Sequence, residues 1–289
     1  MEEAEGGGKM NKFIPLKDGR KIGYREAGMK DGIPLFVCHS TEGTGQGLDD
    51  VNQLACHFGV RLIELHRPGY GLSADLKGRE PLDFAEKVIE CAQYLRLKGY
   101  FVLGISGGGI YALACAYVCP EKVMGAILFP GFGAFSTAWR KKHPKRAGQF
   151  FSKYFAALSL MTVKSQFKRI YKRRPGERSN TVSELDEEIK EMQKEYEQAV
   201  TSVMYESRML QNAWEIPLKK IAVPVEIYEY RKFRGSSILS AQQQKQLPDV
   251  RVHKAPGESR DLWSHKLSHV RTSSQAGDSS RKESNSEED

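Results

Sequence analysis

Ser106 stands in a pattern that is typical of a nucleophilic serine. Residues 104–108 read Gly-Ile-Ser-Gly-Gly, with an apolar run before them and a helical pattern after them. A serine at such a strand-to-helix turn is held in a strained backbone conformation that pushes its hydroxyl outward, and large side chains at Gly104 or Gly108 would clash with neighbouring backbone. The N–H of Gly107 points toward the same place and is suited to hold an oxyanion. The pattern therefore predicts nucleophilic catalysis by Ser106.

The segments around this turn predict a parallel sheet. Asp18 and Gly19 form a hairpin signal between two short strands. Later apolar runs are typical of buried strands, and two segments have apolar residues at helical spacing. The expected strands are Leu35–Cys38, Val60–Leu65, Tyr100–Leu103, Val123–Phe129, Ala222–Tyr228 and Val250–Glu258, and the expected helices are Leu82–Leu95 and Gly109–Cys119. Strands that alternate with helices predict an α/β fold whose mostly parallel sheet is covered on both faces.

The alternation is interrupted once, which predicts an inserted subdomain. At 289 residues the chain is long enough for one large α/β domain with an insertion. We expect a core of residues 13–131 and 217–262, a helical lid at 132–216, and disordered tails at 1–12 and 263–289. The lid includes a long helix over Ser183–Asn212. We expect it to cover the sheet edge that presents Ser106, and Ser106 Oγ to face a cavity lined by the lid.

Charge is distributed unevenly along the chain. The formal net charge is +8. Residues 140–178 are rich in Lys and Arg, and residues 184–197 are rich in Asp and Glu. Adjacent blocks of opposite sign neutralise each other, so the surplus need not mark a nucleic-acid or membrane surface. We expect a small-molecule substrate or ligand, no nucleic-acid partner and no transmembrane segment, since no apolar run approaches the roughly 20 residues that a membrane helix needs.

The cysteines and the N-terminus indicate a reducing compartment. The chain has five cysteines without CxxC spacing, several of them inside apolar segments. These are typical of buried reduced thiols rather than of disulfides or a zinc site. The first residues carry acid and glycine instead of a basic start with an apolar core. We expect a cytoplasmic protein that uses no metal and no cofactor.

Three features in order resemble the α/β-hydrolase superfamily, in its branch of lid-bearing esterases and related hydrolases. The first is the turn at Ser106. The second is His-Arg-Pro-Gly-Tyr-Gly-Leu-Ser at residues 66–73, similar to an Arg-Pro-Gly-Tyr-Gly-x-Ser loop of that family. The third is Val-Cys-Pro-Glu-Lys-Val at 118–123, similar to its helix-to-strand link. The resemblance is strong from Gly19 to Phe129 and faint from Ile216 to Pro256. It implies the α/β-hydrolase fold and a serine esterase or similar hydrolase.

The resemblance implies an oxyanion hole in the loop after the strand that ends at Cys38. The family pattern there is His-Gly-x-x-Gly, whereas residues 39–43 read His-Ser-Thr-Glu-Gly. A backbone N–H of Ser40 or Thr41 is available, and Thr41 is the expected donor alongside Gly107. His39 is expected to brace the loop rather than to act in catalysis.

The acid and the histidine of the catalytic triad are not at the positions that the resemblance implies. Phe233 stands where an Asp is usual, and Ser259-Arg260 follows the last strand where a Gly-His pair is usual. Glu229 is a substitute candidate for the acid, and His265 or His269 for the base. His253 falls inside the last expected strand and fits less well. A serine without a base is a poor nucleophile.

Three functions therefore compete. The first is a serine hydrolase that uses Ser106, the Gly107 and Thr41 amides, and His265 as base. The second is a catalytically impaired protein that keeps the fold as a binding or interaction module. The third is a dinucleotide-binding oxidoreductase, suggested by the spaced glycines of residues 43–47 after a strand and by Glu64 about 20 residues on. That pattern lacks its final glycine, since Leu48 holds the position, and it leaves the turn at Ser106 unexplained.

Overall fold

The computed structural model describes the sheet and its helices. The described residues are 12–40, 48, 51–73, 80–129, 205–206, 216–230, 239–255, 263–264, 267–268, 270–272 and 274. Apart from Tyr205, Glu206 and Ile216, the predicted lid lies outside these residues, so its helical character stays a prediction. The predicted N-terminal tail also lies outside them, except for Lys12.

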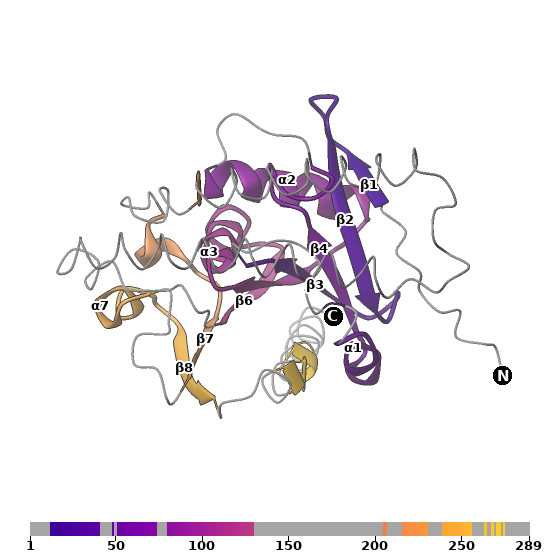
Figure 1. The fold of residues 1–289 in the computed structure, drawn as a ribbon. Coiled ribbons are helices and arrows are strands. Elements are labelled where there is room, and N and C mark those ends of the chain that lie inside the picture. The colour runs from indigo at the N-terminus through magenta and orange to yellow at the C-terminus, as the bar shows by residue number, and fades with distance from the viewer. Residues whose placement is uncertain are drawn as a thin grey trace, which may run out of the picture.

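One eight-stranded sheet forms the centre of the molecule (Figure 1). Its order is β1-β2-β4-β3-β5-β6-β7-β8. β2 runs antiparallel to β1 and β4, and the neighbours from β4 to β8 are parallel. The strands are β1 (Lys12–Pro15), β2 (Lys21–Gly28), β3 (Ile33–Cys38), β4 (Val60–Leu65), β5 (Tyr100–Ile105), β6 (Val123–Phe129), β7 (Val225–Tyr230) and β8 (Val250–Ala255). The predicted mostly parallel sheet is confirmed.

The hairpin predicted at Asp18 and Gly19 joins β1 to β2. Gly19 has φ 83° in the left-handed region, and its N–H donates to the carbonyl of Leu16 at 3.0 Å. Glycine adopts this conformation without the steric cost of a side chain. The Asp-Gly signal thus marks the turn that starts the sheet.

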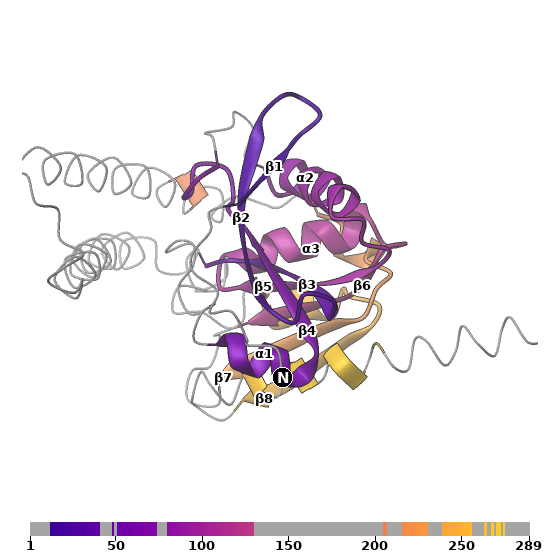
Figure 2. The ribbon, with the colours of Figure 1, turned by 90° about the vertical axis from the view of Figure 1, so that its right-hand side faces the viewer.

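Helices cover both faces of the sheet, as expected. Figure 2 shows α2 (Pro81–Tyr94) and α3 (Gly108–Val118) on one face and α1 (Asn52–Phe58) on the other. The chain moves from β3 to β4 through α1 and then returns past β3 to β5 through α2. Right-handed crossovers in opposite directions place their helices on opposite faces. α1 is not apparent from the sequence pattern, because its seven residues are too few for a clear helical periodicity.

The alternating side chains of the strands build two cores. Phe36, Val102 and Leu128 face α2 and α3. Val37, Leu103 and Ile127 belong to the opposite core, which also contains Ala55 of α1.

The predicted disordered C-terminal tail is wrong over its first residues. Trp263, Leu267 and Val270 pack in the core on the α1 face, and the last two are fully buried. The Trp263 ring lies 5.7 Å from that of Phe129 in an edge contact. Burial of large apolar side chains ties this segment to the sheet and offsets the entropy of ordering it. The core therefore extends beyond residue 262.

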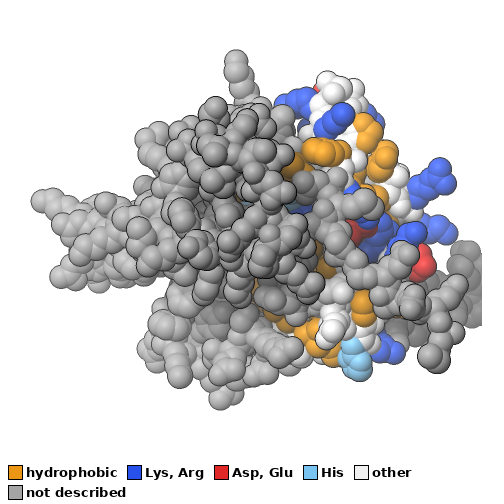
Figure 3. All heavy atoms as spheres, turned by 45° about the vertical axis from the view of Figure 1, so that its right-hand side comes forward, with side chains coloured by type: hydrophobic (Ala, Val, Ile, Leu, Met, Phe, Trp, Pro, Cys, Tyr) orange, Lys and Arg blue, Asp and Glu red, His pale blue; other side chains and the backbone are white. Residues whose placement is uncertain are grey.

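The cysteines are free thiols. Cys38, Cys91, Cys115 and Cys119 are buried as expected, whereas Cys56 is exposed on α1. The prediction of a buried thiol is wrong for Cys56, because this residue lies on the exposed face of α1, a helix that the sequence pattern does not indicate. No helix in the described part of the chain is long and apolar enough to span a membrane. On the described part of the face in Figure 3, Lys and Arg side chains are interspersed with hydrophobic and uncharged ones.

The strand order excludes the dinucleotide-binding alternative. That fold places its first three parallel strands in the order 3-2-1. Here the strand after α2, β5, pairs with β3 and not with β4. Glu64 lies inside β4, where its side chain is buried. The glycines of residues 43–47 lie outside the described residues.

Candidate active site

Ser106 occupies a sharp turn between β5 and α3. Its φ is 53°, and among the described non-glycine residues only Arg96 shares a positive φ. Its N–H donates to the carbonyl of Phe129 at 3.1 Å, and its own carbonyl accepts from the N–H of Gly109 at 3.1 Å. A positive φ is costly for a residue with a Cβ, so the flanking hydrogen bonds must hold this conformation. The strained turn expected from the sequence is present.

Close backbone contacts explain the glycines on either side. A Cβ at Gly104 would lie 2.4 Å from the Cα of Gly109. A Cβ at Gly108 would lie 2.1 Å from the carbonyl oxygen of Cys38 and 2.5 Å from that of His39. Since each of these neighbours is backbone, a side chain could not be accommodated by a rotamer change. The start of α3 is thus packed directly against the carboxyl end of β3.

This contact lies at the topological switch point of the sheet. β3 and β5 are neighbours, with Cys38 beside Gly104 in register. The chain leaves β3 toward one side and leaves β5 toward the other. In open α/β sheets ligands bind outside the carboxyl ends of the strands at such a point. Ser106 and the His39–Ser40 turn therefore occupy the position where a ligand site is expected.

His39 braces the turn after β3, as the sequence analysis predicted. Its Nδ1–H donates to the carbonyl of Ser40 at 2.8 Å, and its Nε2 accepts from the backbone N–H of Arg67 at 3.2 Å. Burial, and then the charge of Arg67, hold the pKa of His39 well below its usual range. A neutral imidazole with one donor and one acceptor nitrogen satisfies both contacts. Both ring nitrogens of His39 are therefore hydrogen-bonded to the protein backbone.

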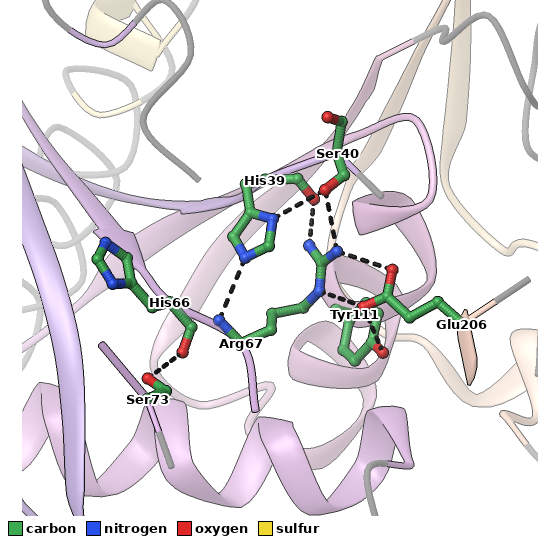
Figure 4. A network of polar contacts seen from close by, with 7 residues as sticks. All are labelled: His39, Ser40, His66, Arg67, Ser73, Tyr111 and Glu206. Atoms are coloured by element: carbon green, nitrogen blue, oxygen red, sulfur yellow. Dashed lines mark hydrogen bonds and ion pairs between the residues drawn. The ribbon is translucent and has the colours of Figure 1, made fainter. Parts of the chain in front are cut away.

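Arg67 is the polar centre of this region (Figure 4). Its side chain is fully buried, and its Nε and Nη2 donate to the two carboxylate oxygens of Glu206 at 2.8 and 2.9 Å. Nη1 donates to the carbonyl of His39, and Nη2 donates to that of Ser40 at 3.1 Å. Although burial alone would lower the pKa of Arg67, the Glu206 carboxylate raises it above its usual value. Arg67 is therefore a permanent cation without direct access to water.

Aromatic groups complete the surroundings of the ion pair. The guanidinium carbon lies 4.7 Å from the ring centroid of Tyr111 and 5.0 Å from that of Tyr70. The Tyr111 hydroxyl donates to Glu206 at 3.1 Å. Cation–π contacts are strongest where water is excluded. Sequence analysis missed this cluster, because Glu206 is 139 positions from Arg67. The signal in the sequence was Arg67 in the loop pattern of residues 66–73, which does not indicate its partner.

Other polar side chains of the loop at residues 66–73 also hold its backbone in place. Ser73 Oγ donates to the carbonyl of His66 at 2.5 Å and accepts from the N–H of Gly23 in β2 at 3.1 Å. His66 Nδ1 accepts from the N–H of Leu72 at 3.1 Å, and burial lowers the pKa of His66 to about 4. These bonds close the loop on itself and fix it to β2, which presents Arg67 to the β3 turn.

Glu229, the candidate acid, is engaged elsewhere. It lies within β7, and its Oε2 accepts from Lys254 Nζ at 2.6 Å. Its Oε1 accepts from the side-chain amide of Gln244 at 3.0 Å. Gln244 belongs to the short helix α7 (Ala241–Gln244). In its present state Glu229 therefore fixes β8 and α7 to β7.

His253 lies inside β8, as predicted, and not beyond it. Its Nε2 is 3.0 Å from a carboxylate oxygen of Glu226 on β7. Its ring stacks on that of Tyr228 with centroids 4.8 Å apart. This Glu–His pair is a cross-strand contact.

Several predicted site residues lie outside the described residues. They are Thr41, His265 and His269, together with Phe233, Ser259 and Arg260. Gly107 is described, at the N-terminus of α3 with φ −59°. Ser106 is buried, and the cavity that we expect beside it stays a prediction, because the chain expected to line it is not described.

Comparisons with known proteins place this geometry in context. No protein-family model matches the chain. A non-heme chloroperoxidase from Streptomyces lividans is 29% identical over 117 residues, which is 40% of this chain. The match spans only 42% of that relative's length.

Solved structures match over nearly the whole chain. The esterase EaEST from Exiguobacterium antarcticum has a TM-score of 0.59 at 19% identity and covers 91% of this chain and all of its own. A carboxylesterase structure from Nitrososphaera gargenis has a TM-score of 0.63 at 14% identity, with 92% of this chain and 100% of that chain covered. Est816, described as an N-acyl homoserine lactone degrading enzyme, has a TM-score of 0.59 at 17% identity, with 89% and 98% covered. At these identities the likeness concerns the fold, and it agrees with the strand order and the turn at Ser106: the chain has the α/β-hydrolase fold.

Proposed function

We propose that this protein is a serine hydrolase that acts on carboxylic esters or similar small substrates. The observation that carries the proposal is the turn at Ser106, with φ 53° where β5 passes directly into α3. A strained residue of this kind persists only where the surrounding structure enforces it, and such residues gather at functional sites. The esterases among the matching structures support the ester class.

The proposed reaction begins with attack by Ser106 Oγ on the substrate carbonyl carbon. The hydroxyl proton passes to a base, and the carbonyl oxygen becomes an oxyanion held by the N–H groups of Gly107 and Thr41. Collapse of the tetrahedral intermediate expels the alcohol, which takes the proton from the base. Water then hydrolyses the acyl-enzyme by the same route in reverse order. No step needs a metal or an organic cofactor.

His265 is the proposed base. Chain order in this fold delivers the histidine after the acid and after the last strand. Trp263 and Leu267, which flank His265 in sequence, pack in the core on the α1 face. This packing supports the proposal, because it ties described residues on either side of position 265 to the sheet.

Glu229 is the candidate acid of the proposed triad. Both carboxylate oxygens of Glu229 accept hydrogen bonds, from Lys254 and from Gln244. Glu229 would orient a histidine only by giving up one of these contacts. The same observation favours a second candidate function, a binding or interaction protein that keeps the fold without turnover.

Probe labelling and ester hydrolysis distinguish the two functions. Wild type, Ser106→Ala, His265→Ala and, as a matched control, His269→Ala are treated with a fluorophosphonate probe and with p-nitrophenyl esters of several acyl lengths. We expect labelling and turnover in the wild type, and a loss of turnover of about 10⁴-fold or more in Ser106→Ala. A comparable loss in His265→Ala but not in His269→Ala supports the proposed base. Absence of both labelling and turnover in the wild type would favour the binding protein.

A further inference from the structure

The turn at Ser106 is followed by residues that do little to hold a helix together. Gly107, Gly108 and Gly109 come directly after it, and no side chain caps the N-terminus of α3. Glycine is a poor helix former, because it has more conformational freedom to lose than any other residue. The carbonyl of Ser106 nevertheless accepts from the N–H of Gly109 at 3.1 Å. The strained turn therefore depends on residues further along α3 to keep these glycines in place.

Tyr111 is the first polar side chain of α3, and several elements hold it. It is buried, and its hydroxyl donates to Glu206 in the segment inserted between β6 and β7 at 3.1 Å. Its ring centroid lies 4.7 Å from the guanidinium carbon of Arg67. Its ring also makes an edge contact with Phe84 of α2, with centroids 5.4 Å apart. Tyr111 thus joins α3 to the inserted segment, to the loop after β4 and to α2 (Figure 4).

The helix carries this attachment back to the turn. The carbonyl of an N-cap residue accepts the first hydrogen bond of a helix, from the N–H four residues on. In α3 these residues are Gly107 and Tyr111. Gly107 directly follows Ser106, and its N–H is the expected oxyanion donor. Close packing of Gly108 on the end of β3 limits movement toward that strand, whereas contacts such as those of Tyr111 limit movement away from it.

We propose that Tyr111 is a positioning residue for Ser106. Its hydroxyl contact with Glu206 fixes the first turn of α3, and through this turn it fixes the backbone of Ser106 and Gly107. This inference rests on the proposed function, which assigns the nucleophile to Ser106. It adds that the inserted segment contributes Glu206 to the geometry of the nucleophile.

Two variants cut this contact from its two ends. Tyr111→Phe keeps the ring beside Arg67 and Phe84 and removes only the hydroxyl. Glu206→Asp keeps the buried negative charge but shortens the side chain that reaches Tyr111. Tyr100→Phe is the matched control, because Tyr100 is also buried but stands at the start of β5, at the opposite end of the strand from Ser106.

The first readout is catalysis by Ser106. The position of a nucleophile matters in the chemical step, so we expect both site variants to lower kcat for p-nitrophenyl acetate while KM stays within about twofold. The expected fall in kcat is about 10-fold, because a small displacement of a reacting group costs up to about 10²-fold. The rate of fluorophosphonate labelling should fall in proportion. Tyr100→Phe should match the wild type in both assays.

Two results of these assays would overturn the inference. One is a wild-type kcat and labelling rate in either folded site variant. The other is an equal fall in Tyr100→Phe, which would mean that any loss of a buried hydroxyl has the same effect. Urea unfolding checks that the variants are folded, and if Tyr111→Phe does not fold, Glu206→Asp decides the outcome.

The second readout does not depend on turnover. Hydrogen–deuterium exchange of the peptide that contains residues 105–111 should be faster in both site variants and unchanged in Tyr100→Phe. If exchange increases only around residue 206, the contact serves the inserted segment alone and the inference is wrong. If the wild type shows neither labelling nor turnover, the proposed function fails, and exchange at residues 105–111 still decides whether Tyr111 orders the turn.

Discussion

The centre of the sheet and its β7–β8 side are built by different means. At the centre, where β3 meets the start of α3, the decisive contacts are between backbones: a Cβ at Gly104 or Gly108 would overlap main-chain atoms. At the β7–β8 side the described polar groups are side chains that pair across the strands, Glu226 with His253 and Glu229 with Lys254. Backbone contacts tolerate no substitution, whereas side-chain pairs do.

This difference offers a physical reason why the sequence has the glycines expected around Ser106 but has Phe233 and Arg260 where the resemblance implies an acid and a histidine. The turn that carries Ser106 is part of how the sheet and α3 fit together, so losing it would cost the fold. An acid or a base on a loop can change without disturbing the core, because loops lie at the surface and contribute little packing. Substitutions on the two sides of the sheet therefore differ in their expected effects.

The largest effect is expected for Arg67→Met, which leaves the Glu206 carboxylate buried without its cation. Removing one partner of a buried ion pair costs about 3–5 kcal/mol of the free energy of unfolding. Arg61→Met is the matched control, because its partner Glu26 keeps Lys12 and both ion-pair side chains are partly exposed. Urea unfolding at pH 7 measures both, and we expect a loss of about 1 kcal/mol or less for Arg61→Met. Equal losses would mean that burial of Arg67 carries no special weight.

The next effect concerns the backbone contact at the centre. In Gly108→Ala the new methyl group meets the carbonyl of Cys38, and overpacking of this kind costs about 3 kcal/mol. Gly19→Ala is the control, since Gly19 has a φ of 83° but a Cβ there would meet nothing within 4 Å. It should lose only about 1–2 kcal/mol, from the unfavourable backbone conformation. Thermal unfolding ranks the two variants, and the reverse order would contradict the steric argument.

A pH effect is expected from His66, which burial keeps neutral. Its pKa is about 4 in the folded state and about 6.5 when unfolded. Between these values the unfolded chain binds a proton that the folded chain does not, so the free energy of unfolding falls as the pH is lowered from 6.5 to 4. The full effect is about 3 kcal/mol or less.

His66→Asn isolates this contribution, because an amide oxygen can accept from Leu72 in place of Nδ1. Chemical unfolding at pH 7, 6 and 5 should show a flatter dependence in the variant than in the wild type. Parallel curves would mean that His66 does not titrate in this way.

The smallest effect is expected on the β7–β8 side. Glu229→Gln should change the free energy of unfolding by less than about 1 kcal/mol, because the Lys254 side chain is 61% exposed and exposed ion pairs contribute little. We expect turnover to stay within about twofold, since both carboxylate oxygens already have partners. A fall in kcat of about 10²-fold or more would assign Glu229 as the acid and remove the contrast between the two sides.

Local features of the sequence determined the parts of the fold that short-range sterics control. The Asp-Gly pair predicted the first hairpin, and the strands β4 and β6 begin and end where the apolar runs do. The glycines around Ser106 predicted a strained turn, because only a close backbone contact demands glycine at both flanks. Each of these features depends on neighbours within a few residues, so the sequence displays them directly.

The tertiary structure alone decided what depends on distant partners. The loop pattern at residues 66–73 draws attention to Arg67, but nothing in the sequence indicates that Glu206, 139 positions away, neutralises it. Trp263, Leu267 and Val270 stand in a stretch that resembles a polar tail, because these apolar residues are widely spaced in the sequence. Their stabilising contacts come from the core on the α1 face of the sheet. The sequence makes Glu229 a candidate acid, whereas in the structure its carboxylate oxygens accept hydrogen bonds from Lys254 and Gln244. The roles of charged residues and of sparse apolar residues depend on long-range contacts. A strained turn such as that at Ser106 is recognisable from its own residues and their immediate neighbours.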